Sequence, residues 1–200
     1  YFTIISGGPG TGKTYVTKVI KKIFLSYAKT HHLPVPKIIC VAPTGKAASK
    51  MDQGITIHSI LKPLKTSPGF YYNKNNTMQT DVIIIDEASM IDIILLTRLL
   101  EAVPLTAKVI VLGDVHQLSS IQAGSVFSDI CKAKGMSPNL FFLDYNYRSK
   151  GKTGIENLSK AINENDARRL EDILIKGRYP DVVFKSLKSK GKIDYFVNKF

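Results

Sequence analysis

The sequence has no apolar run long enough to cross a membrane, and only two cysteines among its 200 residues. A spanning helix needs about 18 consecutive apolar residues, and the first residues lack the pattern of a signal peptide. We therefore expect no membrane contact and a cytoplasmic location. Cys40 and Cys131 lie far apart in apolar surroundings without metal-ligand spacing, which argues against a zinc site or a disulfide framework. Both thiols are expected to be buried and structural.

Acidic residues are also few, with 16 Asp and Glu against 28 Lys and Arg, so the formal net charge is +12. Such an excess favours a polyanionic partner, because clustered Lys and Arg displace counterions from a phosphate backbone. A general bias toward Lys, Ile and Asn explains the charge equally well. The clearest charge run, Lys185, Lys188, Lys190 and Lys192, is either a binding segment or a solvated end.

Short runs dense in Ile, Val and Phe alternate with helical stretches along the chain. Continuous apolar strands are typical of a parallel sheet buried on both faces, and repeated strand–helix units predict a doubly wound α/β domain. The expected strands are residues 1–6, 37–42, 81–86, 108–113 and 140–143. The expected helices are residues 13–30, 46–51, 91–102 and 125–134.

Two segments depart from this rhythm. Residues 66–80 contain Pro, Gly and an Asn/Lys cluster, which predicts an exposed loop or small hairpin. After Arg148 we expect two short amphipathic helices with Asp166 as a cap between them. Their apolar stripes are Ile155, Leu158 and Ile162, then Leu170, Ile173 and Leu174.

Residues 7–14 match the pattern G-x-x-x-x-G-K-[ST] between a predicted strand and a predicted helix, the context that a phosphate-binding loop requires. Glycines let backbone N–H groups point at phosphate oxygens, and the helix adds its positive N-terminal end. Lys13 would reach the β- and γ-phosphates of ATP, and the Thr14 hydroxyl would hold Mg²⁺. A chance glycine-rich turn is the alternative. The predicted nucleotide-binding residues are Gly7, Gly8, Pro9, Gly10, Thr11, Gly12, Lys13 and Thr14.

Two carboxylates follow the apolar stretch 82–85. A buried strand that ends in a carboxylate can deliver Asp86 to the phosphate loop, where it would bind Mg²⁺ directly or through water. Glu87 would orient or deprotonate the water that attacks the γ-phosphate. Alternatively, Glu87 is a favourable charge at the start of the next helix, which does not exclude catalysis.

Gln117 and Arg148 complete the predicted catalytic set with Lys13 and Glu87. The amide of Gln117, in a D-x-x-Q-L pattern, can bond both the γ-phosphate and the attacking water, although a Gln at a strand end is often a plain loop residue. Arg148 would stabilise charge in the transition state of phosphoryl transfer. By itself it is as readily a surface ion-pair partner.

The order of motifs resembles the first half of a superfamily 1 helicase, and in detail the RecD family, the alpha subunits of exodeoxyribonuclease V. The segments that carry this resemblance are residues 7–14, 42–48, 56–59, 86–92, 113–118, 147–148, 154–155 and 161–163. It implies a RecA-like P-loop NTPase, a three-layer α/β/α domain with a mainly parallel sheet, over residues 1–150. Residues 151–200 would form a helical appendage and a basic tail.

The resemblance also implies an ATP-dependent DNA helicase motor that acts in recombinational repair with RecB- and RecC-like subunits, on single-stranded DNA or duplex ends. It places Pro43, Thr44, Lys46 and His58 along the DNA track, where hydroxyl, N–H and cationic groups hold a backbone without reading sequence. His58 is as readily a packing residue. The aromatic run 70–72 either stacks on bases or covers the core.

The sequence departs from the family pattern in having room for only one RecA-like domain. The upstream Gln segment that usually contacts adenine and the later motifs are missing, so we expect an N-terminal motor fragment that is poorly active alone. Alternatives are a stand-alone RecD-like or relaxase-associated helicase, and a P-loop phosphotransferase or nucleotide switch. The Asp86-Glu87 pair argues against a kinase, and the lack of an Asn-Lys-x-Asp motif argues against a GTPase.

Overall fold

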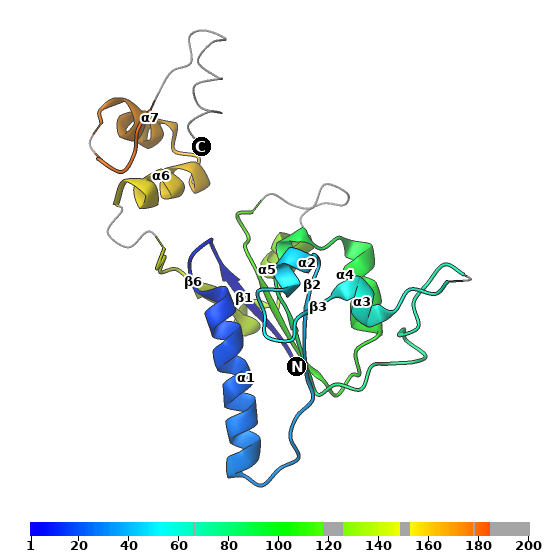
Figure 1. Ribbon diagram of the computed structural model, residues 1–200. Coiled ribbons are helices and arrows are strands. Elements are labelled where there is room, and N and C mark those ends of the chain that lie inside the picture. Colours follow the sequence, from blue (N-terminus) through cyan, green and yellow to red (C-terminus); the bar gives the residue numbers. More distant parts are fainter. Residues whose placement is uncertain (66, 118–125, 149–152, 178, 185–200) are drawn as a thin grey trace. The chain divides into compact units, whose positions relative to one another are not determined.

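The computed structural model describes residues 1–65, 67–117, 126–148, 153–177 and 179–184. The chain divides into two compact units, Tyr1–Arg148 and Ser149–Phe200. Figure 1 shows a sheet with helices in the first unit and a pair of helices in the second. Within the described ranges, no helix has the length and apolar character needed to cross a bilayer. The lysine run at 185–192 lies outside the described residues.

A six-stranded sheet forms the centre of the first unit, with the order β3-β2-β4-β5-β1-β6. The strands are β1 (Phe2–Gly7), β2 (Ile38–Ala42), β3 (Ile55–Thr56), β4 (Val82–Ile85), β5 (Lys108–Gly113) and β6 (Leu140–Leu143). Each neighbouring pair is parallel. The carboxyl ends of all six strands therefore lie at one edge, which is where open α/β sheets bind ligands.

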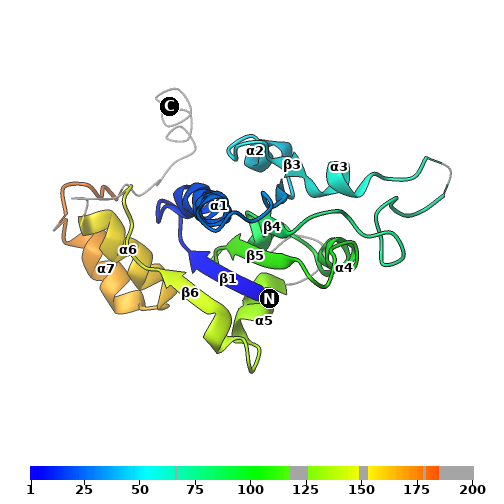
Figure 2. The ribbon, with the colours of Figure 1, turned by 90° about the horizontal axis from the view of Figure 1, so that it is seen from below.

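Helices cover both faces of this sheet. They are α1 (Lys13–Thr30), α2 (Gly45–Ala48), α3 (Ile57–Leu61), α4 (Ile93–Glu101) and α5 (Val126–Lys132), with short 3-10 turns η1 (Ala88–Met90) and η2 (Ser137–Asn139). Side chains alternate along each strand, so Ile83 and Ile85 join the core under α3, α4 and α5, whereas Val82 and Ile84 join the core under α1 and α2. Figure 2 shows α1 and α5 on opposite sides of the sheet. The predicted α/β architecture in three layers is confirmed.

The predicted element boundaries agree closely with the structure, with a few informative differences. The helix over residues 13–30 and the strands over 108–113 and 140–143 have the predicted bounds. The short strand β3 was not predicted, because two residues carry no periodicity. The helix expected over 91–102 begins only at Ile93, since the Asp92 carboxylate accepts the Leu95 N–H at 2.8 Å and fixes the start there. The helices expected over 46–51 and 125–134 end earlier than predicted, because α2 ends at Ala48 and α5 ends at Lys132. Ser125, the expected first residue of α5, lies outside the described residues.

The second unit is a helical hairpin of α6 (Thr153–Asn163) and α7 (Ala167–Ile175). Asp166 caps α7 as predicted, accepting the Arg169 N–H at 3.0 Å. The predicted apolar stripes are only partly right: Ile173 is buried, but Ile162 is 56% exposed. Polar contacts supplement this small core, since an Arg169 guanidinium nitrogen donates to Asn157 Oδ1 at 2.7 Å.

The segment predicted as a loop, of which residue 66 is not described, is irregular and pairs with itself through an antiparallel bridge between Asn73 and Asn76. A second antiparallel bridge joins Phe70 to Pro63, just before the segment. Phe70 and Tyr72 pack against the core, whereas Tyr71 is exposed. Two of the three aromatic residues in this run therefore cover the core.

The two cysteines differ in burial. Both are free thiols, but only Cys40 is buried, whereas Cys131 is half-buried. Burial raises the pKa of each thiol above its usual range. The expectation of two buried structural thiols is right for Cys40 and wrong for Cys131.

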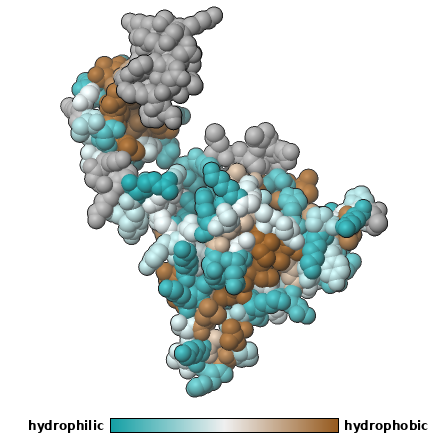
Figure 3. All heavy atoms as spheres, in the orientation of Figure 1, coloured by the Kyte–Doolittle hydropathy of each residue, from teal (hydrophilic) through white to brown (hydrophobic). Residues whose placement is uncertain are grey.

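Helix α1 contacts the sheet along a narrow stripe. Val16, Ile20 and Phe24 pack on the core, whereas Tyr15 and Ile23 are exposed. On the face drawn in Figure 3, hydrophobic areas lie in separate patches among hydrophilic ones. Scattered exposed apolar side chains such as Ile23 are ordinary on protein surfaces. The packing of α1 on the sheet therefore depends on Val16, Ile20 and Phe24.

Candidate functional site

The turn from β1 to α1 is a glycine-shaped loop with an uncapped helix start. Gly10 and Gly12 have φ angles of +81° and +89°, which side chains rarely tolerate. Thr11 closes the turn, since its hydroxyl donates to the Gly8 carbonyl oxygen at 2.9 Å. Gly12 precedes α1, and among the described residues no side chain caps the helix. The first N–H groups of α1 are therefore left for an anion, which the helix dipole also favours.

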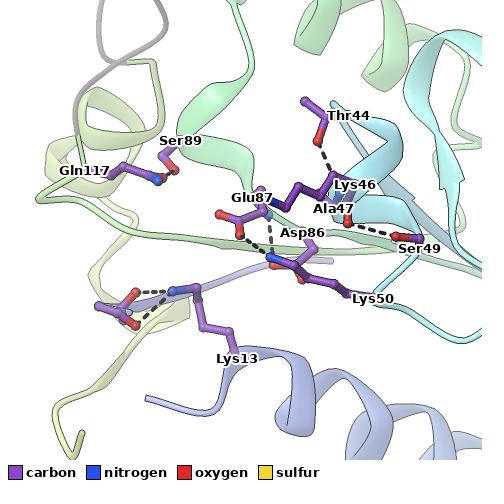
Figure 4. Close-up of polar contacts among 12 residues, drawn as sticks. Lys13, Thr44, Lys46, Ala47, Ser49, Lys50, Asp86, Glu87, Ser89 and Gln117 are labelled. Carbon is purple, nitrogen blue, oxygen red and sulfur yellow. Dashed lines mark hydrogen bonds and ion pairs between the residues drawn. The ribbon is translucent and has the colours of Figure 1, made fainter. Parts of the chain in front are cut away.

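Lys13 folds back over this loop. Its Nζ donates to the carbonyl oxygens of Gly7 at 2.5 Å and Gly8 at 3.0 Å, the two dashed contacts of Lys13 in Figure 4. Charge-assisted hydrogen bonds to an anion are stronger than those to a neutral carbonyl. A phosphate group at the loop would therefore be the better partner for this ammonium group. Thr14, the next residue of α1, is half-buried.

The segment after β6 lies directly against the loop. The Tyr147 N–H donates to the Gly10 carbonyl oxygen at 2.9 Å, and the Arg148 N–H donates to Asn146 Oδ1 at 3.0 Å. A Cβ added at Gly10 would lie 2.5 Å from Asn146 Oδ1 and 2.6 Å from Arg148 Cβ. Gly10 is therefore required both for its backbone conformation and for this close approach, which places Arg148, itself exposed, beside the phosphate loop.

Asp86 follows β4 as a buried carboxylate that is 3% exposed. Burial is the largest influence and raises the pKa of this carboxyl above its usual range, and the Glu87 charge acts in the same direction. The Glu87 N–H, 2.8 Å from Oδ1, and the Lys13 and Lys50 charges oppose that rise without cancelling it. A buried carboxylate in this condition is a suitable cation ligand. Over the described ranges, no cluster of three His, Cys, Asp or Glu residues forms a metal site by itself.

Glu87 has a left-handed backbone conformation, with φ of 53° and ψ of 39°. This conformation costs free energy for a residue with a side chain and is concentrated at functional sites. The Glu87 carboxylate lies 3.9 Å from Lys50 Nζ, which comes from the segment after α2, and Figure 4 shows the two side chains directed toward each other. Glu87 thus precedes η1 rather than an α-helix.

Gln117 follows β5, the strand next to β4. Its side-chain oxygen accepts a hydrogen bond from the hydroxyl of Ser89 in η1, also drawn in Figure 4. The turn before it is closed by the buried Asp114, whose carboxylate accepts the His116 N–H at 2.9 Å and whose carbonyl oxygen accepts the Gln117 N–H at 3.3 Å. Gln117 is therefore connected to the segment that carries Asp86 and Glu87. The neighbouring Leu118 lies outside the described residues.

An open groove of about 740 Å³ runs beside the phosphate loop. Aromatic rings dominate its wall, and two of them, Tyr145 and Tyr147, meet edge to face with centroids 4.6 Å apart. The lining residues are Thr11, Gly12, Tyr15, Val16, Phe142, Leu143, Asp144, Tyr145 and Tyr147. The groove thus offers flat apolar surfaces next to the loop over residues 7–14.

The residues assigned to the DNA track lie on the β2 and β3 side of the same sheet, where two threonine side chains cap the helices. Thr44 caps α2 by accepting the Ala47 N–H at 3.2 Å, and Thr56 caps α3 by accepting the Ser59 N–H at 3.2 Å. His58 and Lys46 are exposed, and Pro43 is half-buried. The His58 ring lies 6.1 Å from that of Phe70. His58 is therefore a surface residue and not part of the core.

Sequence reasoning did not single out Ser89, Lys50 or Tyr15. Each is an ordinary residue type in a region where the chemistry was assigned to a neighbour, and each is placed at the site by contacts between distant segments. Ser89 was visible only as part of the 86–92 segment. Nothing in the sequence indicated its hydrogen bond to Gln117.

Comparison with known proteins agrees with this geometry. A family model described as "AAA domain" matches residues 1–123. The RecBCD enzyme subunit RecD of Mycolicibacterium smegmatis is 32% identical over 197 residues, covering 88% of this chain and 35% of that protein. The ATP-dependent RecD2 DNA helicase of Deinococcus radiodurans is 38% identical over 124 residues, covering 60% of this chain and 16% of that protein.

Solved structures of similar fold include the Pif1 helicase from Candida albicans, with a TM-score of 0.59, 19% identity and coverage of 98% of this chain and 50% of that chain. Bacteroides Pif1 bound to single-stranded DNA has a TM-score of 0.54 and 17% identity, covering 98% of this chain and 51% of that chain. These likenesses confirm the RecA-like P-loop fold. The chain spans 35% to 40% of the length of the RecD relatives that it matches along most of its own length.

Proposed function

This chain belongs to the AAA domain family and is RecD-like in sequence, and on that premise we propose that it is a DNA helicase motor domain driven by ATP hydrolysis. The first unit would be the ATPase body, and the helical hairpin its appendage. The observation that carries the proposal is the convergence at one sheet edge of an uncapped helix start, Lys13 and the buried Asp86. An open anion site beside a carboxylate that favours a cation suits a magnesium triphosphate.

In this proposal the phosphates of ATP occupy the loop 7–14, and Lys13 exchanges its contacts with two carbonyl oxygens for phosphate oxygens. Thr14 and Asp86 would hold Mg²⁺. The ion, when bound, neutralises charge on the β- and γ-phosphates. The ammonium group of Lys13 would leave these carbonyl oxygens for the phosphate, because a charged phosphate oxygen is the stronger acceptor.

Three residues around the loop would carry out hydrolysis. Glu87 orients and deprotonates the attacking water, and its constrained backbone keeps the carboxylate at the end of β4. Gln117 bonds the γ-phosphate. Arg148, beside Gly10, stabilises charge on the transferred group.

The aromatic groove gives the nucleoside a place next to the phosphates. Gly12 and Thr11 belong both to the phosphate loop and to the groove wall, so a nucleotide anchored by its phosphates can direct its base toward Tyr15, Tyr145 and Tyr147. Stacking on aromatic rings suits a flat base.

DNA is the proposed second ligand, held along the side of the sheet that carries Pro43, Thr44, Lys46 and His58. The proposed partners are RecB- and RecC-like subunits, because the RecD relatives are named as subunits of the RecBCD enzyme. In this proposal the protein acts in the cytoplasm, in recombinational repair. A second candidate is a stand-alone helicase, since the Deinococcus RecD2 helicase is 38% identical over its matched region.

The lysine of the loop provides the test. We expect Lys13→Ala to weaken magnesium-dependent binding of a non-hydrolysable ATP analogue by about 100-fold, because it removes charge-assisted bonds of roughly 1.5–3 kcal/mol each. Calorimetric titration measures this affinity, and circular dichroism checks the fold. Lys18→Ala, an exposed lysine on the same helix, is the matched control and should bind normally. Equal affinity of the Lys13→Ala variant and the unmodified protein would exclude a phosphate loop.

A further inference from the structure

The hydrogen bond between Ser89 and Gln117 joins two segments that come from neighbouring strands. Ser89 lies in η1, three residues beyond Asp86, and is 7% exposed. Its hydroxyl donates to Gln117 Oε1. Because β4 and β5 are parallel neighbours, the residues that follow them meet at the same sheet edge. The contact therefore depends on the tertiary fold and not on local sequence.

Both ends of this hydrogen bond are held by tight turns. Around Ser89, the Met90 N–H donates to the Glu87 carbonyl oxygen at 3.0 Å, and the Ile91 N–H donates to that of Ala88 at 3.1 Å. Before Gln117, the Asp114 side chain and carbonyl oxygen both accept backbone N–H groups, at 2.9 and 3.3 Å. Such constraints reduce the number of positions that either side chain can adopt.

The chemistry of the amide makes the direction of this bond important. A glutamine side chain has an acceptor end and a donor end, and a free amide can turn either end toward a ligand. Phosphate oxygens only accept hydrogen bonds. The amide oxygen, with its partial negative charge, and the negatively charged phosphate oxygens would repel each other. Only the NH₂ end of the amide can therefore bond the phosphate.

We propose that Ser89 is a positioning residue that holds the oxygen of the Gln117 amide, so that its NH₂ group is directed at the γ-phosphate. The inference rests on the proposed function and deepens it, because it assigns the part of the site that distinguishes ATP from ADP. Ser89 touches no reacting atom. It acts through Gln117 and connects the γ-phosphate contact to the segment that carries Glu87.

The test compares the affinities for a non-hydrolysable ATP analogue and for ADP, each with Mg²⁺, in the intact protein by calorimetric titration. The ratio of the two affinities isolates the γ-phosphate. We expect Ser89→Ala to reduce this ratio by about tenfold, the effect of one lost hydrogen bond to a charged group, while the affinity for ADP stays the same. Ser89→Thr, which keeps the hydroxyl, should retain the ratio.

Thr80 offers a control of equal burial. It is also 7% exposed, and its hydroxyl lies 2.9 Å from both the Lys37 and the Val82 carbonyl oxygens, at the opposite end of β4. Thr80→Val should lower the melting temperature without changing the affinity ratio. If Ser89 had only a structural role, Ser89→Ala would behave like Thr80→Val, and the proposal would be wrong.

Gln117 supplies a second route that does not depend on Ser89→Ala folding. Gln117→Glu keeps an acceptor for the Ser89 hydroxyl but replaces the NH₂ group with oxygen, so it should reduce the ratio at least as much as Ser89→Ala. The double variant Ser89→Ala/Gln117→Ala should match Gln117→Ala alone, because both changes remove the same contact. Additive effects, or a normal ratio in Gln117→Glu, would overturn the inference.

The outcomes separate this inference from the proposed function. Nucleotide binding that does not depend on Lys13 removes the proposed function, and the inference fails with it. Lys13-dependent binding with a preference for the ATP analogue, unaffected by Ser89→Ala, leaves the ATPase assignment intact and removes only the role of Ser89.

Discussion

Two strand-to-helix turns at the same edge of the sheet differ in whether a side chain bonds the first N–H groups of the helix. Each turn leads from a parallel strand into a helix whose first N–H groups need partners. After β2, Thr44 caps α2 with its own side chain. After β1, Gly12 provides no side chain, and α1 starts uncapped. The capped turn is satisfied within the protein, whereas the first N–H groups after the uncapped turn remain accessible to water or to a ligand.

The same contrast extends to the neighbouring residues. Thr56 caps α3 just as Thr44 caps α2. On the other side, the two hydrogen bonds of Lys13 Nζ go to neutral carbonyl oxygens, and Asp86 is a buried carboxylate whose pKa burial raises. On the β1 and β4 side, a magnesium triphosphate would supply partners for the α1 N–H groups, Lys13 and Asp86, whereas on the β2 and β3 side the helix starts are already capped by protein side chains.

The largest expected effect comes from placing a side chain in the uncapped turn. We expect Gly10→Ala to reduce the free energy of unfolding by roughly 1–3 kcal/mol, because alanine is strained at this φ. Its Cβ would also collide with Asn146 and Arg148, so nucleotide affinity should fall. Urea denaturation and calorimetry measure the two effects.

Gly45→Ala is the matched control in the capped turn. Gly45 is the first residue of α2, and a Cβ there would meet nothing within 4 Å. This change should stabilise the protein by about 0.4–1 kcal/mol, since alanine has fewer unfolded conformations. Equal effects of the two substitutions would contradict the difference between the turns.

The next effect concerns the cap itself. We expect Thr44→Ala to reduce the free energy of unfolding by about 1 kcal/mol, because the Ala47 N–H loses its partner. Thr44→Ser should retain most of this stability. Affinity for the ATP analogue should be unchanged in both variants, since this turn is not part of the phosphate loop. A loss of nucleotide affinity as large as the loss of stability would show that the two turns are coupled.

The smallest expected effect is electrostatic and depends on pH. The pKa of Asp86 is higher in the folded state than in the unfolded state, so between these two values the folded protein holds more protons. The free energy of unfolding must then fall as pH rises through that window, and it stays lower above it. Asp86→Asn removes this decrease, and the variant should be more stable than the unmodified protein at neutral pH, by less than the loss caused by Thr44→Ala.

Ligand addition sharpens this prediction. A magnesium nucleotide should raise the melting temperature of the unmodified protein, because a bound cation compensates the buried carboxylate. The Asp86→Asn variant should gain less. Thermal denaturation over a pH series, with and without the nucleotide, checks both effects, and an Asp86→Asn protein that is less stable at neutral pH would contradict them.

Much of the fold was predictable because its signals are local. The alternation of apolar runs and helical stretches predicted the strands within about one residue, and Asp166 was identified as a cap from its type and position. Errors arose where non-local contacts decide the outcome. Ile162 lies on the predicted apolar stripe yet is exposed, and β3 is a strand only because it pairs with β2.

The site shows the same division between local and non-local information. The predicted phosphate loop is a contiguous motif, since consecutive residues must curl around one anion, so its residues could be predicted from the sequence alone. The partners of the side chains were not predictable. Lys50 lies near Glu87, Ser89 bonds Gln117, and Tyr147 bonds Gly10, and each pair joins segments far apart in the chain.

The α/β class and the predictions for the phosphate loop and for Asp86 and Glu87 came from the amino-acid sequence, because periodicity and motif spacing are properties of neighbouring residues. Only the folded chain shows which of the polar groups have partners within the protein. That distinction depends on burial and on hydrogen bonds between parallel strands, and both exist only after distant segments have packed together.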